Sequence, residues 1–574
     1  MEHQIREHHP RPDFIREDWV SLDGEWEFSL GDDRFDRKIL VPFCYQSEKS
    51  GIGETKDYQV VWYCRRFPID REKLKNRRLL LKFGAVDYQA YVYIDDQFVG
   101  SHEGGNTPFA FDITDYAAGD EAVVAVKVCD GLEADKPRGK QSWREEPFGC
   151  WYTPTTGIWQ SVWLEYAGET YITKLKVTPH VKTQDALCEV FVSGNEPVFA
   201  EVEAVIDSVS TGKRIWLGTQ KILCENGYGK CVIAFPDWDN RQHLILWSPQ
   251  CPNLVDVGVT LKNPLTEDRV STYFGMRLGE FKNGGFFING DVCFQRLVLD
   301  QGYWPDTLLT PPDGEAIKKD ILLTKEMGFN GARKHQKIED PRYYYWADLL
   351  GLLVWGELPS CYCYTDRTVK RSVNEMIEFL DRDFNHPCII TWVPVNESWG
   401  IRNVKTSARQ QSFSNLMICL IKSLDPTRTV SGNDGWEQTE QTDILAIHDY
   451  LLQPDNLDKY DSLYDVIYGK AENRVLLADG QEYKGQPVML TEYGGIAFDD
   501  GEEGWGYYHK AKGEDEFLAR LEPVTDFLLK SGKFAGYCYT QLTDVMQEVN
   551  GLLYPDRSPK VAVEKLKKIF GKTY

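Results

Sequence analysis

Residues 389–397 read Ile-Ile-Thr-Trp-Val-Pro-Val-Asn-Glu, an apolar run that ends in a carboxylate. A second run of the same kind, Val-Met-Leu-Thr-Glu, occupies residues 488–492. Continuous apolar runs of this length are typical of strands in parallel sheets that are buried on both faces. In an α/β barrel, the residues that follow such strands lie at the mouth that carries the chemistry. The two runs therefore predict a barrel with Glu397 and Glu492 at its mouth.

Short apolar runs alternate with segments of helical spacing throughout residues 279–574. The expected strands are 295–299, 331–333, 352–355, 389–393, 429–431, 445–447, 488–491 and 534–539. The expected helices are 315–327, 341–350, 369–384, 406–423, 514–530 and a closing helix at 559–570. The apolar stripe of 514–530 extends from Phe517 to Leu528, and Pro523 within it predicts a kink. Eight strand–helix units predict a C-terminal (β/α)₈ TIM barrel.

The chain before the barrel has a different pattern, in which short alternating or β-branched runs are separated by Gly, Asp and Asn turns. In residues 1–168 these runs predict a jelly-roll-like β-sandwich. Residues 169–278 have the same spacing and fewer aromatic residues, which predicts a smaller, immunoglobulin-like β-sandwich. The fold class we expect is a multidomain β and α/β protein with the barrel at 279–574.

Composition excludes several classes of function. The 574 residues carry 65 basic and 88 acidic side chains, a formal charge of −23, which argues against nucleic acid as a partner. No apolar stretch reaches the roughly 18 residues that a membrane helix needs, so we expect no membrane contact and a cytoplasmic location. The 14 cysteines include no C-x-x-C pair, so most are expected to be reduced core residues. We expect neither a metal nor a cofactor, and homo-oligomerisation stays open.

The two strand-end glutamates matter as a pair. A single glutamate in such a place is most simply explained by hydrogen bonds within a loop. Strands four and seven lie across a barrel of eight, so both carboxyl groups can point into one pocket, as glycoside cleavage requires. One carboxyl would then act as a general acid with a raised pKa, and the other would stay ionised to attack the anomeric carbon.

Motifs along nearly the whole chain resemble glycoside hydrolase family 2, the family of β-galactosidases, β-glucuronidases and β-mannosidases. The residues that carry the resemblance are 19–28, 62–67, 100–105 and 155–160 in the first sandwich, Trp247-Ser248-Pro249 and Phe274-Gly275-Met276-Arg277 around the second, and Asn396-Glu397 and Thr491-Glu492-Tyr493-Gly494 in the barrel. The resemblance implies a retaining mechanism, with Glu397 as the acid/base and Glu492 as the nucleophile.

Neighbouring positions acquire roles from the same resemblance. Asn396 would hydrogen-bond the sugar 2-hydroxyl, and Arg333 would keep the nucleophile ionised unless it forms a purely structural salt bridge. Tyr450 would hydrogen-bond the nucleophile, although Tyr493 is an alternative. Glu357, at the end of strand three, could orient Arg333 or contact the sugar or a metal.

Other polar and aromatic residues follow strands and could contact substrate. His335 and His448 could donate to sugar hydroxyls as neutral imidazoles or serve as structural residues. Asp300 could fix a hydroxyl group. Three tryptophans in loops at the expected mouth could stack on a sugar or pack their own loops, and these are Trp304, Trp399 and Trp505.

The chain departs from the family in ways that bear on the substrate. After strand eight it lacks the Asn-x-Lys element that resembles a uronate clamp of family β-glucuronidases, so a glucuronide is disfavoured. We therefore expect an exo-acting retaining β-glycosidase of β-galactosidase type whose partner is a small-molecule or oligosaccharide β-glycoside. The alternatives are a β-glucuronidase, β-mannosidase or arabinosidase of the same family, a transglycosylase, and an inactive carbohydrate-binding protein.

Overall fold

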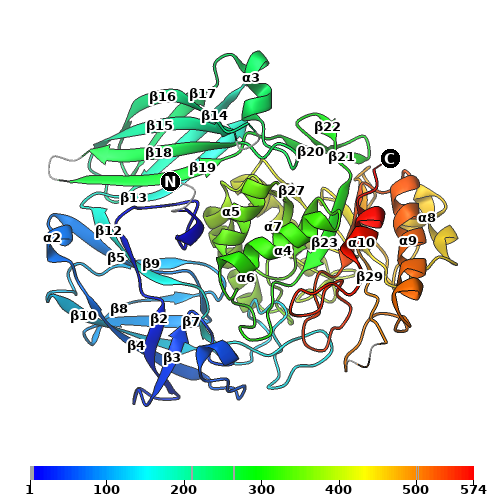
Figure 1. The fold of residues 1–574 in the computed structure, drawn as a ribbon, viewed down its shortest axis with the longest axis horizontal. Coiled ribbons are helices and arrows are strands. Elements are labelled where there is room, and N and C mark those ends of the chain that lie inside the picture. Colours follow the sequence, from blue (N-terminus) through cyan, green and yellow to red (C-terminus); the bar gives the residue numbers. More distant parts are fainter. Residues whose placement is uncertain (1–5, 209–210, 263–265, 500, 502, 574) are drawn as a thin grey trace.

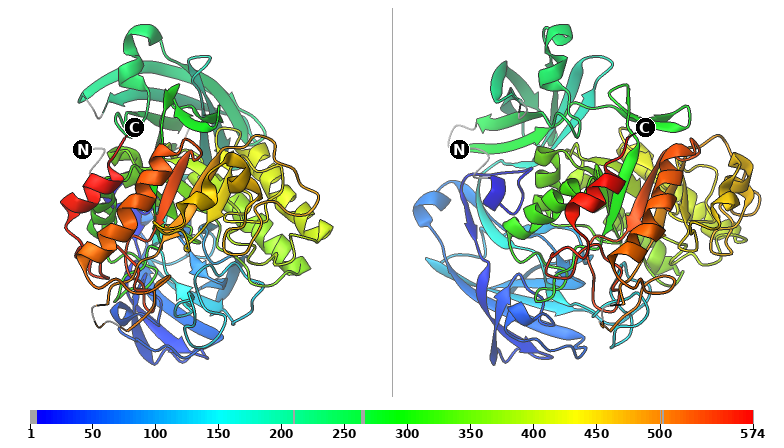
Figure 2. Two further views of the ribbon diagram at one scale, coloured as in Figure 1. Left: turned by 90° about the vertical axis from the view of Figure 1, so that its right-hand side faces the viewer. Right: turned by 45° about the vertical axis from the view of Figure 1, so that its right-hand side comes forward.

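The computed structural model describes residues 6–208, 211–262, 266–499, 501 and 503–573. Two β-rich units and a curled parallel sheet surrounded by helices make up the molecule (Figure 1). Two further views show that the helix-bearing unit packs against both of the β-rich units (Figure 2). The expected fold class, two sandwiches followed by a TIM barrel, is confirmed.

The first sandwich packs a six-stranded sheet, of order β3-β2-β4-β10-β7-β8, against a four-stranded sheet, of order β1-β12-β5-β9. In β10 every second residue from Ala122 to Val128 is buried, which is the alternation that a half-buried strand requires. The elements are β1 Trp19–Ser21, β2 Gly24–Leu30, β3 Arg37–Val41, η1 Glu48–Ser50, β4 Val60–Pro68, α2 Arg71–Leu74, β5 Arg77–Phe83, β6 Val86–Asp87, β7 Gln89–Ile94, β8 Gln97–Glu103, β9 Phe109–Asp112, β10 Glu121–Cys129, β11 Gly157–Ile158 and β12 Val162–Gly168.

The second sandwich packs a three-stranded sheet, β13-β14-β17, against a four-stranded sheet, β16-β15-β18-β19, around its own apolar core. A small sheet, β20-β21-β22, then leads into the barrel. The elements are β13 Ile172–His180, β14 Asp185–Val192, β15 Val198–Ser208, β16 Lys213–Cys224, β17 Tyr228–Ala234, α3 Trp238–Ile245, β18 Leu254–Lys262, β19 Glu267–Phe274, β20 Gly279–Lys282, β21 Gly285–Ile288 and β22 Asp291–Val292.

The barrel sheet has eight parallel strands, and its first strand, β23, pairs with both β24 and the last strand, β30. The strands are β23 Gln295–Asp300, β24 Gly331–Lys334, β25 Leu353–Glu357, β26 Ile389–Val393, β27 Thr429–Val430, β28 Leu445–His448, β29 Val488–Gly494 and β30 Gly536–Thr540. The helices are α4 Gly314–Glu326, α5 Pro341–Leu350, α6 Asp366–Asp383, α7 Ala408–Leu424, η2 Leu457–Tyr460, α8 Leu463–Tyr468, α9 Glu514–Lys530 and α10 Val563–Phe570.

All eight expected barrel strands and all six expected helices are present, with ends that differ by a few residues. The closing helix begins at Val563 rather than at residue 559, and β29 continues two residues beyond Glu492. The stripe from Phe517 to Leu528 is buried, as its spacing predicts. No helix in the described ranges combines the length and apolarity that a membrane crossing needs.

A buried arginine joins the two sandwiches. Arg16 precedes the first strand and donates through Nε and Nη2 to Asp268 of β19, at 2.8 and 2.9 Å, and through Nη1 to Glu165 of β12. Its Nη2 also donates to the Ile172 carbonyl oxygen at 2.9 Å. Both carboxylates are buried, so their charges depend on Arg16 and, for Glu165, on Lys82 at 3.0 Å.

We predict that Arg16→Ala destabilises the protein by about 3 kcal/mol or more, because it leaves Asp268 as a buried carboxylate without its cation. The midpoint of urea unfolding, followed by tryptophan fluorescence, measures the effect. Arg34→Ala is the control, since the Arg34 side chain is 73% exposed in its pair with Asp32, and its midpoint should not change. Equal midpoints for the two variants would contradict the prediction.

Candidate active site

The two glutamates meet at the carboxyl ends of the barrel strands. Glu492 lies within β29, and Glu397 lies four residues beyond the end of β26. Single carboxylate oxygens of Glu397 and Glu492 and a ring nitrogen of His448 all lie within 4.8 Å of one another. The structure thus brings the two predicted carboxyl groups together, and their catalytic roles stay predictions.

Glu492 is the more enclosed of the two carboxylates, with 5% of its side chain exposed. Its Oε1 accepts a hydrogen bond from Arg333 Nη1 at 2.9 Å, and its Oε2 accepts one from the Tyr450 hydroxyl. Tyr450 stacks in parallel on Tyr507, with ring centroids 3.4 Å apart. Both oxygens are thus held in fixed directions. Tyr493, the alternative tyrosine, donates to or accepts from Thr525 instead.

Glu397 is more open, with 19% of its side chain exposed. Its Oε1 lies 2.8 Å from His448 Nδ1, and its Oε2 accepts from Trp399 Nε1 at 3.2 Å. Burial acts to raise the pKa of Glu397, but the hydrogen bond and charge of His448 lower it overall. Its backbone has φ 51°, a left-handed conformation that is held by a hydrogen bond from its N–H to the Asp434 carbonyl oxygen.

Arg333 in β24 connects most of the acidic groups. Its guanidinium contacts Glu357 at 2.8 Å, Glu492 at 2.9 Å and Asp434 at 3.2 Å, and it is fully buried. It also donates to Asn396 Oδ1 at 2.6 Å. Burial acts to lower the pKa of Arg333, but the surrounding carboxylates raise it overall. Burial raises the pKa of Glu357 to about 7, so the Arg333 contact offsets only part of its desolvation.

The two predicted histidines have different surroundings. His335 is buried, and burial together with Arg333 lowers its pKa, which favours the neutral ring; its contact with a sugar stays a prediction. His448 differs from the expectation, because both ring nitrogens face carboxylates. Its Nδ1 meets Glu397 and its Nε2 meets Asp434, each at 2.8 Å. No ring nitrogen of His448 is therefore left for a sugar hydroxyl.

Two residues after β23 are engaged within the protein. Asp300 forms an ion pair with Lys334 at 2.9 Å, which lowers its pKa against the effect of burial. Trp304 lies beneath the cations of Arg557 and Lys337, 4.7 and 5.3 Å from its ring, and is 8% exposed. Their sugar contacts stay predictions, since a sugar would have to compete with these partners.

A loop from the first sandwich reaches the barrel mouth. Residues 130–156, here called the bridging loop, connect β10 to β11 and extend along the barrel as the cyan trace in Figure 1. The Arg138 N–H donates to the Ser360 carbonyl oxygen at 3.0 Å. Further along, the Gly149 carbonyl oxygen accepts from Trp505 Nε1 at 3.0 Å. The indole N–H of Trp505 thus serves to anchor this loop.

Aromatic side chains of the bridging loop collect beside Glu397. Trp151 meets Trp399 edge to face, with ring centroids 5.0 Å apart, and Trp143 stacks on Tyr362 at 4.1 Å. Trp143 and Trp151 contact each other at 4.7 Å, and both are half-buried. Since Trp399 donates to Glu397 Oε2, this aromatic cluster lies beside that carboxyl group.

The bridging loop also brings a cation that sequence reasoning missed. Lys140 is buried, and its Nζ lies 3.3 Å from Glu548, which also accepts from the Tyr152 hydroxyl. Burial acts to lower the pKa of Lys140, but Cys150, Glu548 and Glu492 raise it overall. The one feature of the sequence that could have indicated a role for this loop is the density of aromatic and charged residues at 140–152.

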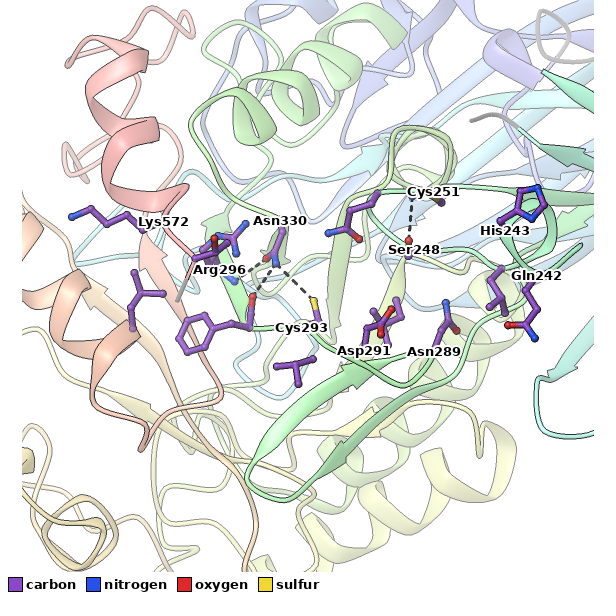
Figure 3. A pocket seen from close by; sticks show the side chains of 17 residues that line it. Gln242, His243, Ser248, Cys251, Asn289, Asp291, Cys293, Arg296, Asn330 and Lys572 are labelled. Atoms are coloured by element: carbon purple, nitrogen blue, oxygen red, sulfur yellow. Dashed lines mark hydrogen bonds between the residues drawn. The ribbon is translucent and has the colours of Figure 1, made fainter. Parts of the chain in front are cut away.

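A second concavity lies at the opposite end of the barrel. It has a volume of about 910 Å³ and is lined by residues that precede the strands, including Cys293 and Asn330, together with Ser248 and Cys251 of the second sandwich (Figure 3). Because catalysis in α/β barrels takes place where strands end, this pocket is separate from the carboxylate pair.

Asp434, one of the carboxylates around Arg333, is a residue that the sequence patterns did not point to. It follows β27 and contacts Arg333 and His448. The polar Gly-Asn-Asp-Gly turn at 432–435, directly after a strand, was the signal for it. Glu397, His448 and Glu492 could together hold a cation, but Arg333 already supplies positive charge there, and the absence of a metal stays a prediction.

Comparison with protein families gives two matches. Residues 50–164 match the sugar binding domain of glycosyl hydrolases family 2, and residues 312–573 match the TIM barrel domain of the same family. Together the two matches cover more than half of the chain. They include the first sandwich from β4 onward with its bridging loop and most of the barrel, with both glutamates.

Individual relatives are more distant. The chain is 27% identical over 497 residues to a β-galactosidase of Thermoanaerobacter pseudethanolicus, which covers 83% of this chain and 60% of the relative. It is 28% identical over 404 residues to a putative β-glucuronidase of Formosa agariphila, covering 67% of this chain and 46% of the relative. The chain thus spans no more than about 60% of the length of these two relatives.

Solved structures share the fold over nearly the full length. A β-galacturonidase from Eisenbergiella tayi has a TM-score of 0.76 at 19% identity and covers 97% of both chains. A β-D-glucuronidase from Dictyoglomus thermophilum has a TM-score of 0.77 at 19% identity and covers 99% of both chains. At these identities the likeness concerns the fold.

Proposed function

Because the chain belongs to glycoside hydrolase family 2, we propose that it is an exo-acting retaining β-glycosidase with β-galactosidase-type activity. The observation that carries the proposal is the pairing of Glu397 and Glu492. Single oxygens of the two carboxylates lie within 4.8 Å of each other. Oxygens this close favour the roughly 5–5.5 Å separation between the carboxyl groups of retaining enzymes over the roughly 6.5–9.5 Å of inverting ones.

The environments of the two glutamates support different roles. Glu492 has both oxygens fixed by Arg333 and Tyr450, which suits a nucleophile that attacks the anomeric carbon from one direction. Glu397 is more exposed and can meet both the leaving oxygen and the water that later replaces it, as an acid/base must. Asn396, held by Arg333, is our candidate for the sugar 2-hydroxyl.

The bridging loop supports exo-action and an aglycone contact. It contacts the βα loops that carry Ser360, Trp399 and Trp505, so it narrows the mouth on several sides. A narrowed mouth favours a terminal sugar over an internal one. Trp151 and Trp399 offer half-buried aromatic faces next to Glu397, where the leaving group departs.

The charges of the pocket favour a neutral sugar. The buried cations near the carboxylates are already paired, Arg333 with three acids, Lys140 with Glu548, and Lys337 with Glu339 at 2.9 Å. A uronate would place another negative charge among these acids. The β-galactosidase among the relatives favours a galactoside, and the putative β-glucuronidase keeps a uronide as the alternative.

Azide rescue tests the assignment of the two glutamates. In Glu492→Gly, azide should occupy the vacated space and attack once, which gives a glycosyl azide of inverted configuration. In Glu397→Ala, azide should intercept the covalent intermediate and give the retained configuration, while turnover of substrates with good leaving groups is spared. NMR of the anomeric proton distinguishes the products.

The control for azide rescue is Glu375→Gln, which changes a buried glutamate that accepts hydrogen bonds from Asn106, away from the site. It should turn over substrate without forming a glycosyl azide. Exchanged product configurations would reverse the assignment of Glu397 and Glu492. Near-normal rates in both site variants would show that neither glutamate is catalytic, and would favour a carbohydrate-binding protein over an enzyme.

For specificity, we expect kcat/KM for 4-nitrophenyl β-galactoside to exceed that for the β-glucuronide at least about tenfold, or about 1.4 kcal/mol. The physical reason is that, among the residues that the structure describes, the buried cations Arg333, Lys140 and Lys337 already pair with acidic groups. Steady-state kinetics on the two substrates measure the ratio. Equal or faster glucuronide turnover, lost in Lys140→Met, would show that Lys140 leaves Glu548 to bind a uronate.

For the aglycone, we expect Trp151→Ala to raise KM for aryl β-glycosides about tenfold, because stacking and the associated burial contribute roughly 1–2 kcal/mol. KM for the methyl glycoside should change much less. Trp216→Ala is the control, since this side chain is 62% exposed on the second sandwich. If KM rises equally for both kinds of glycoside, the bridging loop supports the site without touching the aglycone.

A further inference from the structure

The imidazole of His448 lies between two carboxylates at hydrogen-bond distance. Nδ1 is 2.8 Å from Glu397 Oε1, Nε2 is 2.8 Å from Asp434 Oδ1, and the ring is fully buried with its edge against Trp436. An ionised carboxylate can only accept a hydrogen bond. Two such contacts therefore need two protons among Asp434, His448 and Glu397.

One of these protons has a fixed place. Asp434 Oδ1 lies 3.2 Å from the Arg333 guanidinium, and its Oδ2 accepts from the Ser431 hydroxyl at 2.8 Å. Burial acts to raise the pKa of Asp434, but Arg333 and His448 lower it overall, so this carboxyl stays ionised. The Nε2 proton thus remains on the ring, and the second proton is shared between His448 Nδ1 and Glu397 Oε1.

Charged groups on every side determine where the shared proton rests. Besides Glu397 and Asp434, the ring faces Glu492, 3.5 Å from Nδ1, and Arg333, 3.4 Å from Nε2. Burial acts to lower the pKa of His448, but the three carboxylates raise it to about 10. At neutral pH the free protein therefore holds an imidazolium beside an ionised Glu397.

This resting state is the opposite of what a lone general acid needs. An acid/base glutamate normally starts protonated, with a raised pKa. The pair of His448 and Glu397 resolves the conflict, because a proton on Nδ1, which lies 2.8 Å from Oε1, can pass to Oε1 without entering from solvent.

We propose that His448, held by Asp434, is a positioning residue that stores the catalytic proton for Glu397, an inference that rests on the proposed function of Glu397. In the first step the Nδ1 proton passes to Glu397 Oε1, and Glu397 protonates the leaving oxygen as the C1–O bond breaks and Glu492 bonds to C1. In the second step water attacks C1, the C1–Glu492 bond breaks, and Glu397 takes the proton of the water and returns it to Nδ1. Each cycle restores both residues.

The variant His448→Gln tests the inference, because the glutamine amide can hydrogen-bond Glu397 but does not titrate and so cannot transfer a proton. At pH 8 we expect kcat/KM for a methyl glycoside to fall about 100-fold, the lower range of general acid catalysis, and for a 2,4-dinitrophenyl glycoside to fall less than about 3-fold. At pH 5, where Glu397 can take a proton from solvent, the methyl glycoside defect should shrink at least about fivefold.

The pH profile gives a second readout. In the wild type, the pair of His448 and Glu397 loses its shared proton only at alkaline pH, so kcat/KM should begin to fall, along the basic limb of its profile, only at alkaline pH. In His448→Gln and in Asp434→Asn the proton is lost at lower pH, and the limb should move down by at least about one pH unit. His386→Gln is the matched control, since it removes a buried imidazole that pairs with Asp348 at 2.6 Å elsewhere, and its basic limb should stay in place.

Two outcomes separate this inference from the proposed function. A defect in His448→Gln that is equal for both leaving groups and at both pH values, or an unmoved basic limb, would show a purely structural role and overturn the inference. If Glu397→Ala also failed to spare the 2,4-dinitrophenyl glycoside, the assignment of Glu397 itself would fall. If Glu397→Ala still turned over the 2,4-dinitrophenyl glycoside, but the defect of His448→Gln did not depend on pH, only the proposed role of His448 would be overturned.

Discussion

The site depends on one fully buried guanidinium. Arg333 faces Glu357, Asp434 and Glu492, which come from the ends of three other strands or the loops after them. Without it, these carboxylates would repel one another in a region that excludes water, and their pKa values would rise. Apolar packing of the same volume would avoid the desolvation of these ions. The cluster is therefore better explained by the chemistry of the pocket than by stability.

The backbone gives two chemically identical side chains different surroundings. Glu492 projects from a strand that continues to Gly494, and its oxygens meet Arg333 and Tyr450. Glu397 lies past the end of β26 in a left-handed conformation, which turns its carboxyl toward His448 and the open side. A carboxylate fixed on a strand suits attack along one line, and one on a turn suits proton exchange with changing partners.

The sequence was sufficient for the fold and for the pairing of the two glutamates, because both follow from apolar runs whose period does not depend on distant residues. It was insufficient for partners that come from elsewhere. Lys140 and Trp151 belong to a loop of the first sandwich, and although its aromatic and charged residues are dense, this pattern does not indicate that the loop reaches the barrel. Asp434 lies in a polar turn after a strand of only two residues, and such a turn does not by itself distinguish a site residue from an ordinary loop residue.

The same limit explains why some expected sugar contacts have protein partners instead. A position after a strand predicts that a side chain is near the mouth, but not which neighbour occupies its polar atoms. Asp300 meets Lys334 from the adjacent strand, and the two nitrogens of His448 meet carboxylates from the loops after β26 and β27. Polar groups in a water-poor pocket must satisfy one another before any ligand arrives. A substrate therefore adds to a network that is already paired, and its selectivity depends on which of these pairs it can replace without leaving a buried charge alone.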